Sequence, residues 1–202
     1  SSKNDKEKDY YYILDEIGLL SEVQMNSYEF HIWGSNASNK NKPNMMVFDL
    51  DPDKSLSLDK LRLGEKYLKE ILDNLNLKSF LKTSGGKGYH ICIPFKNNLT
   101  WKKFYKISED IANIIEKTHS ELFTTNNRKE KRKNKIFIDY LRNQKSATFV
   151  APYSVRLRKN APVSMPIAWN ELDKIKPNEI TIYKAIKRLK KKDPWKEFFT
   201  SN

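Results

Sequence analysis

The chain has 202 residues, of which 38% are hydrophobic and 31% charged, enough for one substantial hydrophobic core. Its single cysteine, Cys92, excludes an internal disulfide, three scattered histidines argue against a Cys/His zinc cluster, and no apolar run is long enough to cross a bilayer. The net charge of +13 favours a polyanionic partner such as nucleic acid, although lysine-biased codon usage would give the same excess. The polar start lacks a signal-peptide core, so we expect an intracellular, cytoplasmic and nucleoid-associated protein.

The predicted elements alternate between helices and strands in the first half of the chain. Residues 1–9 are expected to be a disordered lead segment, followed by one domain over residues 10–202. Hydrophobic patterns predict helices at 10–20, 58–75, 101–122 and 178–190, and strands at 28–33, 45–51, 79–83, 89–95, 136–141 and 147–155. Because the later strands become consecutive, this order favours an α+β fold over a doubly wound sheet.

Two aspartates, Asp49 and Asp51, end the predicted strand 45–51 and are separated only by Leu50. Alternate side chains of a strand share a face, so both carboxylates point the same way and Leu50 points to the other side. Two like charges this close repel each other, and a fold keeps them when a cation holds them together. The pair therefore predicts a divalent-metal site.

Three of the six glycines fall in one short segment, Ser84-Gly-Gly-Lys87-Gly-Tyr-His90, between two predicted strands. Glycines at this density indicate a backbone that turns tightly or approaches a ligand closely. Backbone amides of such a turn can hold phosphate oxygens, Lys87 can neutralise their charge, and Ser84 and His90 can add hydrogen bonds. The spacing is not that of a Walker loop, and an ordinary hairpin turn with an exposed lysine would show the same pattern. Beside the Asp-x-Asp strand we favour the phosphate site.

Asp139 is a lone acid inside the apolar strand predicted at 136–141. Taken alone, it could be a strand-end acid paired with a nearby lysine. If it faces Asp49 and Asp51, three carboxylates could hold two divalent ions. Two-metal sites activate an attacking hydroxyl and stabilise a leaving pyrophosphate, so this hypothesis predicts phosphoryl transfer.

Basic residues form two further patterns. Arg156 and Arg158 lie two residues apart, so on a strand they would share a face and suit triphosphate or phosphodiester oxygens. A solvated edge strand would show the same spacing. The basic stretch 128–135 and the tail 184–192 could contact a DNA backbone, although such runs are more often merely solvated.

An Asp-x-Asp strand, a Ser-Gly-Gly-Lys-Gly-x-His turn and a strand aspartate occur here in the order of the three motifs of the archaeo-eukaryotic primase superfamily. From about residue 10 to 200 the chain resembles, more closely, the polymerase domain of bacterial ligase D. The segments that carry this resemblance are 19–35, 47–52, 82–90, 136–143, 151–166 and 193–195. The resemblance implies a primase-polymerase catalytic core, similar to the RRM fold, with a mixed, mainly antiparallel sheet flanked by helices.

The resemblance also implies roles for individual residues. Two ions, Mn²⁺ or Mg²⁺ with manganese favoured, would be held by Asp49, Asp51 and Asp139. The triphosphate would be bound by Ser84, Lys87 and His90. The surroundings of the triphosphate and the template end would include Arg142, Arg156 and Arg158. The incoming nucleotide would lie beside His31.

The activity that the resemblance implies is template-dependent nucleotidyl transfer in non-homologous end joining, by a DNA/RNA polymerase that extends DNA 3′ ends and prefers ribonucleotides. Expected partners are DNA ends, primer-template DNA and nucleoside triphosphates, together with the ligase and end-binding proteins of the same pathway. Two alternatives stay open: a primase that starts chains de novo, and a catalytically silent module that binds DNA ends. Domains of this family carry about a hundred further residues ahead of this segment, so the usual N-terminal part is expected to be lacking.

Overall fold

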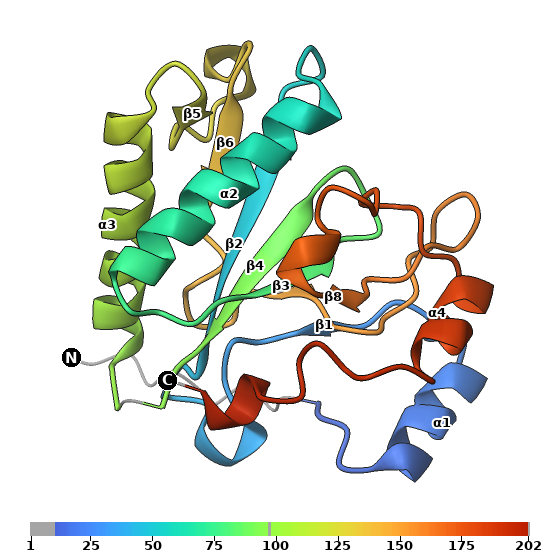
Figure 1. Cartoon of the computed structure of the whole chain (residues 1–202). Helices are drawn as coiled ribbons and strands as arrows, with labels where there is room; N and C mark the ends of the chain where they lie inside the picture. The colour runs from blue at the N-terminus through green and yellow to red at the C-terminus, as the bar shows by residue number, and fades with distance from the viewer. Residues whose placement is uncertain (1–10, 97, 202) are drawn as a thin grey trace.

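A computed structural model describes residues 11–96 and 98–201 and arranges them around a six-stranded sheet (Figure 1). The predicted lead segment 1–9 and the first residue of the predicted helix 10–20 lie outside the described residues. The α-helices are α1 (Glu16–Gln24), α2 (Leu58–Asn74), α3 (Trp101–Thr118) and α4 (Ile182–Arg188). The strands are β1 (His31–Ile32), β2 (Met45–Pro52), β3 (Phe80–Thr83), β4 (Tyr89–Pro94), β5 (Phe123–Thr124), β6 (Ile136–Asp139), β7 (Phe149–Val150) and β8 (Pro166–Ile167). Short 3₁₀ helices are η1 (Ala37–Asn39), η2 (Lys129–Lys131), η3 (Trp169–Glu171) and η4 (Phe198–Thr200).

The larger sheet has the strand order β5-β6-β2-β4-β3-β8. All its neighbours are antiparallel except β5 and β6, which are parallel. A second sheet consists of β1 and β7 alone, paired antiparallel. The predicted α+β class, with a mixed and mainly antiparallel sheet flanked by helices, is confirmed.

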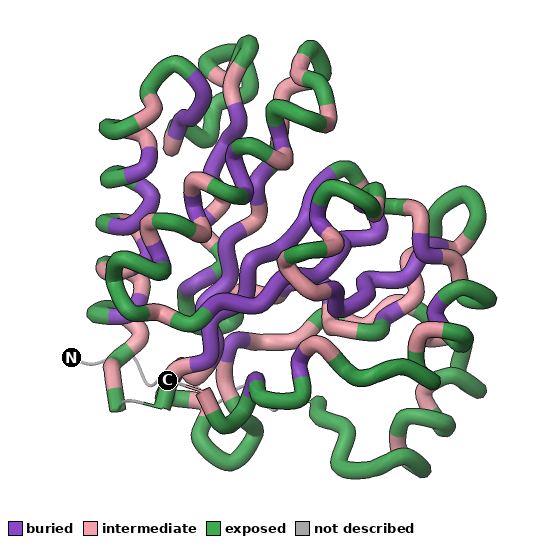
Figure 2. Tube along the Cα trace, in the orientation of Figure 1, coloured by how far each residue is buried: buried purple, intermediate pink, exposed green. Residues whose placement is uncertain are grey.

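The two faces of the sheet are covered differently. On one face, α2 and α3 pack over a large apolar core that includes Phe48 and Leu50 of β2, and this buried layer follows the central strands in Figure 2. On the other face, Met45 and Val47 are buried in a smaller cluster with Trp195 and other aromatic residues near the C-terminus. That smaller cluster covers only part of its face. Asp49 and Asp51 continue the row of Met45 and Val47 beyond it, because alternate residues of a strand share a face.

The two long helices begin where their capping residues predict. The Thr100 side chain accepts a hydrogen bond from the backbone N–H of Lys103, and Ser57 caps α2 in the same way through Lys60. Helix α3 ends at Thr118, short of the predicted end at 122, because the backbone N–H groups of both Leu122 and Phe123 turn back to the carbonyl of His119. This turn leads directly into β5.

The predicted strands 28–33 and 147–155 are each reduced to two residues. Only His31 and Ile32 pair with Val150 and Phe149. Beyond β7 the chain turns away, and Tyr153 adopts a left-handed backbone with a φ of 67°, which no extended strand can contain. The segment after it is therefore a loop.

The two terminal helices were predicted with wrong boundaries. Helix α1 starts at Glu16, where the Asp15 side chain caps it through Gly18, and it buries no side chain. Helix α4 is shorter than the predicted range 178–190, because residues before Ile182 run beside the loop around Val163 instead, with Val163 N–H donating to the Ile180 carbonyl. Within the described part of the chain, no helix combines the length and the apolar character needed to cross a bilayer.

Candidate active site

The three predicted acidic residues lie together on the sheet face opposite α2 and α3. Asp49 of β2 lies directly opposite Asp139 of β6 on one side and His90 of β4 on the other. Cross-strand partners in antiparallel pairs point to the same face, and Asp51 shares that face two residues further along β2. Leu50 points into the core, as the alternation predicted. The strand register therefore gathers Asp49, Asp51, Asp139 and His90 in one place.

Asp139 is the last residue of β6, so the strand ends two residues earlier than predicted. Its carboxylate turns the chain: Oδ1 accepts the backbone N–H of Leu141 at 3.0 Å and Oδ2 accepts Nε of Arg142 at 3.1 Å. The alternative interpretation paired Asp139 with a nearby lysine. In the structure its partner is instead an arginine, Arg142, three residues later. Arg142 thus lies against the acidic group at the edge of the site.

The glycine turn packs tightly against its neighbours. Gly85 has a φ of 66°, and a Cβ at this position would lie 2.5 Å from Cγ of Arg156. A Cβ on Gly88 would lie 2.6 Å from the Leu50 carbonyl oxygen, so the turn touches the backbone of β2 between the two aspartates. The glycines were predicted to allow a tight turn or the close approach of a ligand. The atoms that approach Gly85 and Gly88 most closely belong to the protein itself.

The Ser84 hydroxyl closes the turn. It donates to the Gly88 carbonyl at 2.7 Å and accepts the Gly86 N–H at 3.1 Å. We expected this hydroxyl to donate directly to a phosphate. In this arrangement it does not, because its hydrogen is already used within the turn. Lys87 at the tip is exposed.

A cavity of about 530 Å³ joins these groups. Nine of the ten predicted site residues line it, namely Asp49, Asp51, Ser84, Lys87, His90, Asp139, Arg142, Arg156 and Arg158. The expectation that the last two arginines share the face of a strand is wrong, since both lie in the loop after Tyr153. Arg156 reaches the turn from that loop and donates from Nη1 to the Ser84 carbonyl at 2.6 Å.

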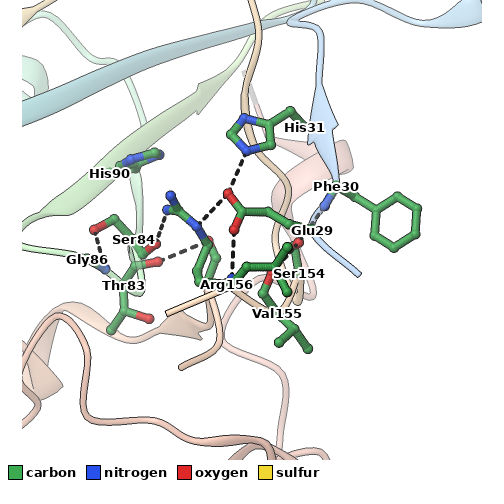
Figure 3. Close-up of polar contacts among 12 residues, drawn as sticks. Glu29, Phe30, His31, Thr83, Ser84, Gly86, His90, Ser154, Val155 and Arg156 are labelled. Atoms are coloured by element: carbon green, nitrogen blue, oxygen red, sulfur yellow. Dashed lines mark hydrogen bonds and ion pairs between the residues drawn. The ribbon is translucent and has the colours of Figure 1, made fainter. Parts of the chain in front are cut away.

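His31 is the predicted residue that does not line the cavity. Its Nε2 lies 2.9 Å from Oε1 of Glu29, and the same oxygen lies 2.9 Å from Nε of Arg156 (Figure 3). His31 is therefore linked to the cavity through Glu29. The sequence reasoning missed Glu29, because no local pattern marks an acid in so short a strand region.

Arg132 is a second residue that the sequence reasoning missed. Its guanidinium lies 3.6 Å from the centre of the Phe137 ring, and its Nη1 lies 3.4 Å from Oδ2 of Asp51. It lines the cavity, so at least this member of the basic stretch 128–135 is more than a solvated charge. Its position four residues before the start of β6 is the only sequence signal that could have singled it out.

The charges of the site shift one another's pKa values. Burial would raise the pKa of Asp49, but the neighbouring positive groups His90, Lys82 and Arg142 outweigh it and lower that pKa. Burial and then the charge of Asp49 raise the pKa of Asp51, in spite of Arg132. Asp139 also has a raised pKa, through burial and the charge of Asp49, with Arg142 opposing. The acidic groups therefore repel one another, and a cation among them would relieve this.

Carboxylate oxygens with unrelieved negative charge are the ligands that Mg²⁺ and Mn²⁺ prefer, so the donor chemistry of the site fits such ions. In residues 11–96 and 98–201, no three His, Cys, Asp or Glu side chains are already gathered as ligands of a single ion. Instead Arg142 holds the carboxylate of Asp139 and Arg132 approaches that of Asp51. Binding of a metal would thus compete with these two arginines.

Beside His90 lies a buried lysine. Lys82 is opposite His90 in the β3–β4 pair, is fully buried, and donates from Nζ to the Ser164 hydroxyl at 2.7 Å. Burial lowers its pKa to about 8, and the charge of Asp49 counteracts part of that effect. Burial and the charge of Lys82 lower the pKa of His90, against the pull of Asp49.

Comparisons with known proteins identify the family of this chain. The family model described as "LigD, primase-polymerase domain" matches residues 1–195. The chain belongs to this family. Its sequence is 36% identical over 184 residues to the multifunctional non-homologous end joining protein LigD of Pseudomonas aeruginosa, covering 89% of this chain and 22% of that protein. It is 30% identical over 174 residues to the bifunctional protein LigD of Bacillus subtilis, covering 85% of this chain and 28% of that protein.

A solved LigD structure shares the fold. The polymerase domain from Mycobacterium tuberculosis ligase D in complex with DNA superposes with a TM-score of 0.81 at 26% sequence identity. The match covers 91% of this chain and 67% of the solved chain. This LigD primase-polymerase chain therefore spans between a fifth and a third of its full-length curated relatives and about two thirds of the solved domain. The predicted family is confirmed.

Proposed function

We propose that this chain is a template-dependent nucleotidyltransferase that adds nucleotides to DNA 3′ ends in non-homologous end joining. The observation that carries the proposal is the strand register, which lines up Asp49, Asp51 and Asp139 in one cavity with the glycine turn and Arg156. A cavity lined by both acidic and basic groups suits a metal-bound nucleoside triphosphate. Family membership supports the same reaction class.

In this proposal, Asp49, Asp51 and Asp139 would hold two divalent ions, Mn²⁺ or Mg²⁺. When bound, such ions activate the attacking 3′-hydroxyl and stabilise the leaving pyrophosphate. The primer 3′-hydroxyl loses its proton to solvent and its oxygen bonds to the α-phosphorus, while the bond from that phosphorus to the oxygen bridging to the β-phosphate breaks and pyrophosphate leaves. The primer is thereby extended by one nucleotide.

The basic residues of the cavity bind and orient the triphosphate. Lys87 is the exposed point charge at the tip of the turn, and Arg156 and Arg158 offer forked donors to phosphate oxygens. His90 lies between Asp49 and the turn, with Nε2 at 3.4 Å from Oδ2 of Asp49. These groups neutralise charge that develops on the leaving pyrophosphate.

DNA is the proposed second substrate, because the solved relative was determined in complex with DNA and this chain carries a net charge of +13. Arg132, at the cavity, connects the basic stretch 128–135 to the reacting groups. Ribonucleotide and manganese preference, and cooperation with the ligase and end-binding proteins of the pathway, are proposed from the family resemblance.

Primer extension tests the reaction. With a primed template, Mn²⁺ and ribonucleotides the chain should add nucleotides, and Asp139→Asn should abolish the addition. Asp173→Asn is the control, since Asp173 is an exposed acid that pairs with Lys66 away from the cavity. Extension by Asp139→Asn at the parental rate contradicts the metal assignment. Replacing the ribonucleotides by deoxyribonucleotides measures the sugar preference.

Two further assays separate the alternatives. Synthesis on a template without primer would identify a primase that starts chains de novo. DNA binding that persists in Asp49→Ala, with no nucleotide addition by the parent chain, would identify a silent end-binding module. DNA affinity should fall steeply with salt, because bound phosphates release counterions. The double variant Lys131→Ala/Lys133→Ala should reduce that slope, and Lys102→Ala/Lys103→Ala on α3 should not.

A further inference from the structure

We infer that Glu29 is a positioning residue of the nucleotide site, which holds the Arg156 guanidinium against the glycine turn and fixes His31 beside it. The inference rests on the proposed function, since it concerns how the triphosphate site is built. Glu29 lies just before β1, far in sequence from both the turn and Arg156. Figure 3 shows the four groups converging.

The Glu29 carboxylate makes three contacts. Oε1 lies 2.9 Å from Nε of Arg156 and 2.9 Å from Nε2 of His31. Oε2 accepts the backbone N–H of Leu157 at 2.8 Å. Burial would raise the pKa of Glu29, but the hydrogen bonds from His31 and Leu157 and the charge of Arg156 outweigh it, so that its pKa is lowered. The carboxylate is therefore ionised at neutral pH and its charge is matched by the groups around it.

Arg156 is fixed from two sides. Glu29 faces its Nε, and the Ser84 carbonyl accepts from its Nη1 at 2.6 Å. The stem of the side chain runs past Gly85, where a Cβ would lie 2.5 Å from Cγ of Arg156. The contact with Glu29 is an ion pair and that with Ser84 is a hydrogen bond, so the five N–H donors of the guanidinium are not all used. Arg156 is thus held in one rotamer while donors stay available for phosphate oxygens.

The backbone next to Glu29 is hydrogen-bonded to the loop that carries Arg156. Phe30, the residue between Glu29 and β1, makes this connection: its N–H donates to the Ser154 hydroxyl at 2.8 Å and its carbonyl accepts from the Ala151 N–H at 2.9 Å. The β1–β7 pair continues this connection. Through Arg156, Glu29 therefore links the small sheet to the glycine turn of the large sheet.

Such a contact affects binding through preorganisation. A free arginine side chain loses rotamer freedom when it binds a phosphate, and a carboxylate that holds it beforehand removes part of that cost. The carboxylate itself is an anion and would repel the triphosphate if it were unpaired. Glu29 therefore acts through Arg156 and His31 and is not expected to touch the nucleotide.

The experiment measures the dissociation constant of ATP with Mn²⁺, without DNA, for four proteins: the parent chain, Glu29→Gln, Glu29→Asp and Glu171→Gln. Glu29→Gln keeps the shape but removes the charge, and it should weaken ATP binding about tenfold. Glu29→Asp keeps the charge and should restore part of the affinity. Glu171→Gln is a matched control, because Glu171 also pairs with an arginine, Arg188, and accepts a backbone N–H, from Ala168.

Thermal unfolding of each variant separates positioning from general stability. We expect Glu29→Gln and Glu171→Gln to lower the melting temperature to a similar degree, with only the former weakening ATP binding. In primer extension, Glu29→Gln should raise KM for the nucleotide more than it lowers kcat. Equal ATP affinity of Glu29→Gln and the parent overturns the inference, as does an equal loss in both glutamate variants.

A double-mutant cycle tests the connection to Arg156. In an Arg156→Gln background, Glu29→Gln should change ATP affinity much less than it does in the parent chain, because the group that Glu29 positions is gone. Fully additive losses overturn the inference. A parent chain that binds ATP but does not extend primers contradicts the proposed reaction while leaving the role of Glu29 testable. A parent chain that binds no ATP refutes both.

Discussion

Asp49 of β2 lies directly opposite Asp139 of β6, and the two carboxylates share one face of the sheet with Asp51. This register turns two acids that are distant in the sequence into one charged group. Burial raises the pKa of Asp139, Arg142 opposes it, and the facing charge of Asp49 adds to it. The mutual repulsion is the electrostatic property that a bound cation would relieve.

Removing the charge of Asp49 should therefore lower the pKa of both neighbours. In Asp49→Asn, without metal, the pKa values of Asp51 and Asp139 should fall, since the Asp49 charge contributes to raising each. Carboxyl-carbon NMR titration measures the two values. Asp53→Asn is the control, because the Asp53 carboxylate is exposed and bound to Ser55. Unchanged values in Asp49→Asn would contradict the shared charge group.

Asn143 should be important for stability rather than for chemistry. After β6 ends, its side chain continues the pairing of β2: Oδ1 accepts the Val47 N–H and Nδ2 donates to the Val47 carbonyl, each at 2.7 Å. Asn143→Ala leaves both buried backbone groups without these partners and should lower the free energy of unfolding by about 2–4 kcal/mol. Urea denaturation measures it. Gln144→Ala, an exposed amide next to it, should cost less than about 0.5 kcal/mol.

Gly85→Ala should damage the turn more than Gly86→Ala. At Gly85 the left-handed φ of 66° costs about 1–2 kcal/mol for an L-residue, and the new methyl would displace Arg156. At Gly86 the nearest atom is Nη1 of Arg158, 3.2 Å away at the flexible end of its side chain. Denaturation curves and ATP titrations of the two variants should both show this order. Equal effects would mean that Arg156 adjusts freely.

Glu65 should make stability depend on pH. It is fully buried on α2, and neither carboxylate oxygen has a hydrogen-bond partner in the described part of the chain. Burial, with a further contribution from the charge of Asp49, raises its pKa well above the usual value. The folded protein therefore holds this proton more tightly than the unfolded chain does.

The sign of the dependence follows from that difference. The contribution is complete below the unfolded pKa of about 4.3 and is lost as the pH rises towards the folded pKa, by up to about 1.4 kcal/mol per pH unit. Glu65→Gln removes the titration and should flatten the dependence between pH 5 and 8 in urea denaturation. Glu70→Gln, at an exposed position of the same helix, should keep the parental slope. A parental slope in Glu65→Gln would refute the prediction.

The features that the sequence predicted well are those set by neighbours in the chain. The strand with Asp49 and Asp51, the hairpin around the glycine turn and the cap of α3 at Thr100 depend on alternation, on turn residues and on a side chain three residues from its partner. The family followed from the same motifs. Such local patterns are independent of how the rest of the chain packs.

Those local patterns could not predict the lengths of the short strands or that the two arginines lie in a loop. Residues 147–155 read as a strand, yet only Phe149 and Val150 form one, and Tyr153 turns the chain away before the single bridge of Val155 to Val163. Strand length depends on which other segment pairs with it, and that choice is made by distant residues. Arg156 and Arg158 consequently reach the cavity from a loop.

By itself, the sequence determined the residue types of the site, the order of its three motifs and the α+β class. Only the tertiary structure decided that Asp139 faces Asp49, that Asn143 completes the pairing of β2, and that Glu29 holds Arg156. The reason is physical: register, burial and ion pairing are properties of atoms close in space. The sequence records only which atoms are close along the chain.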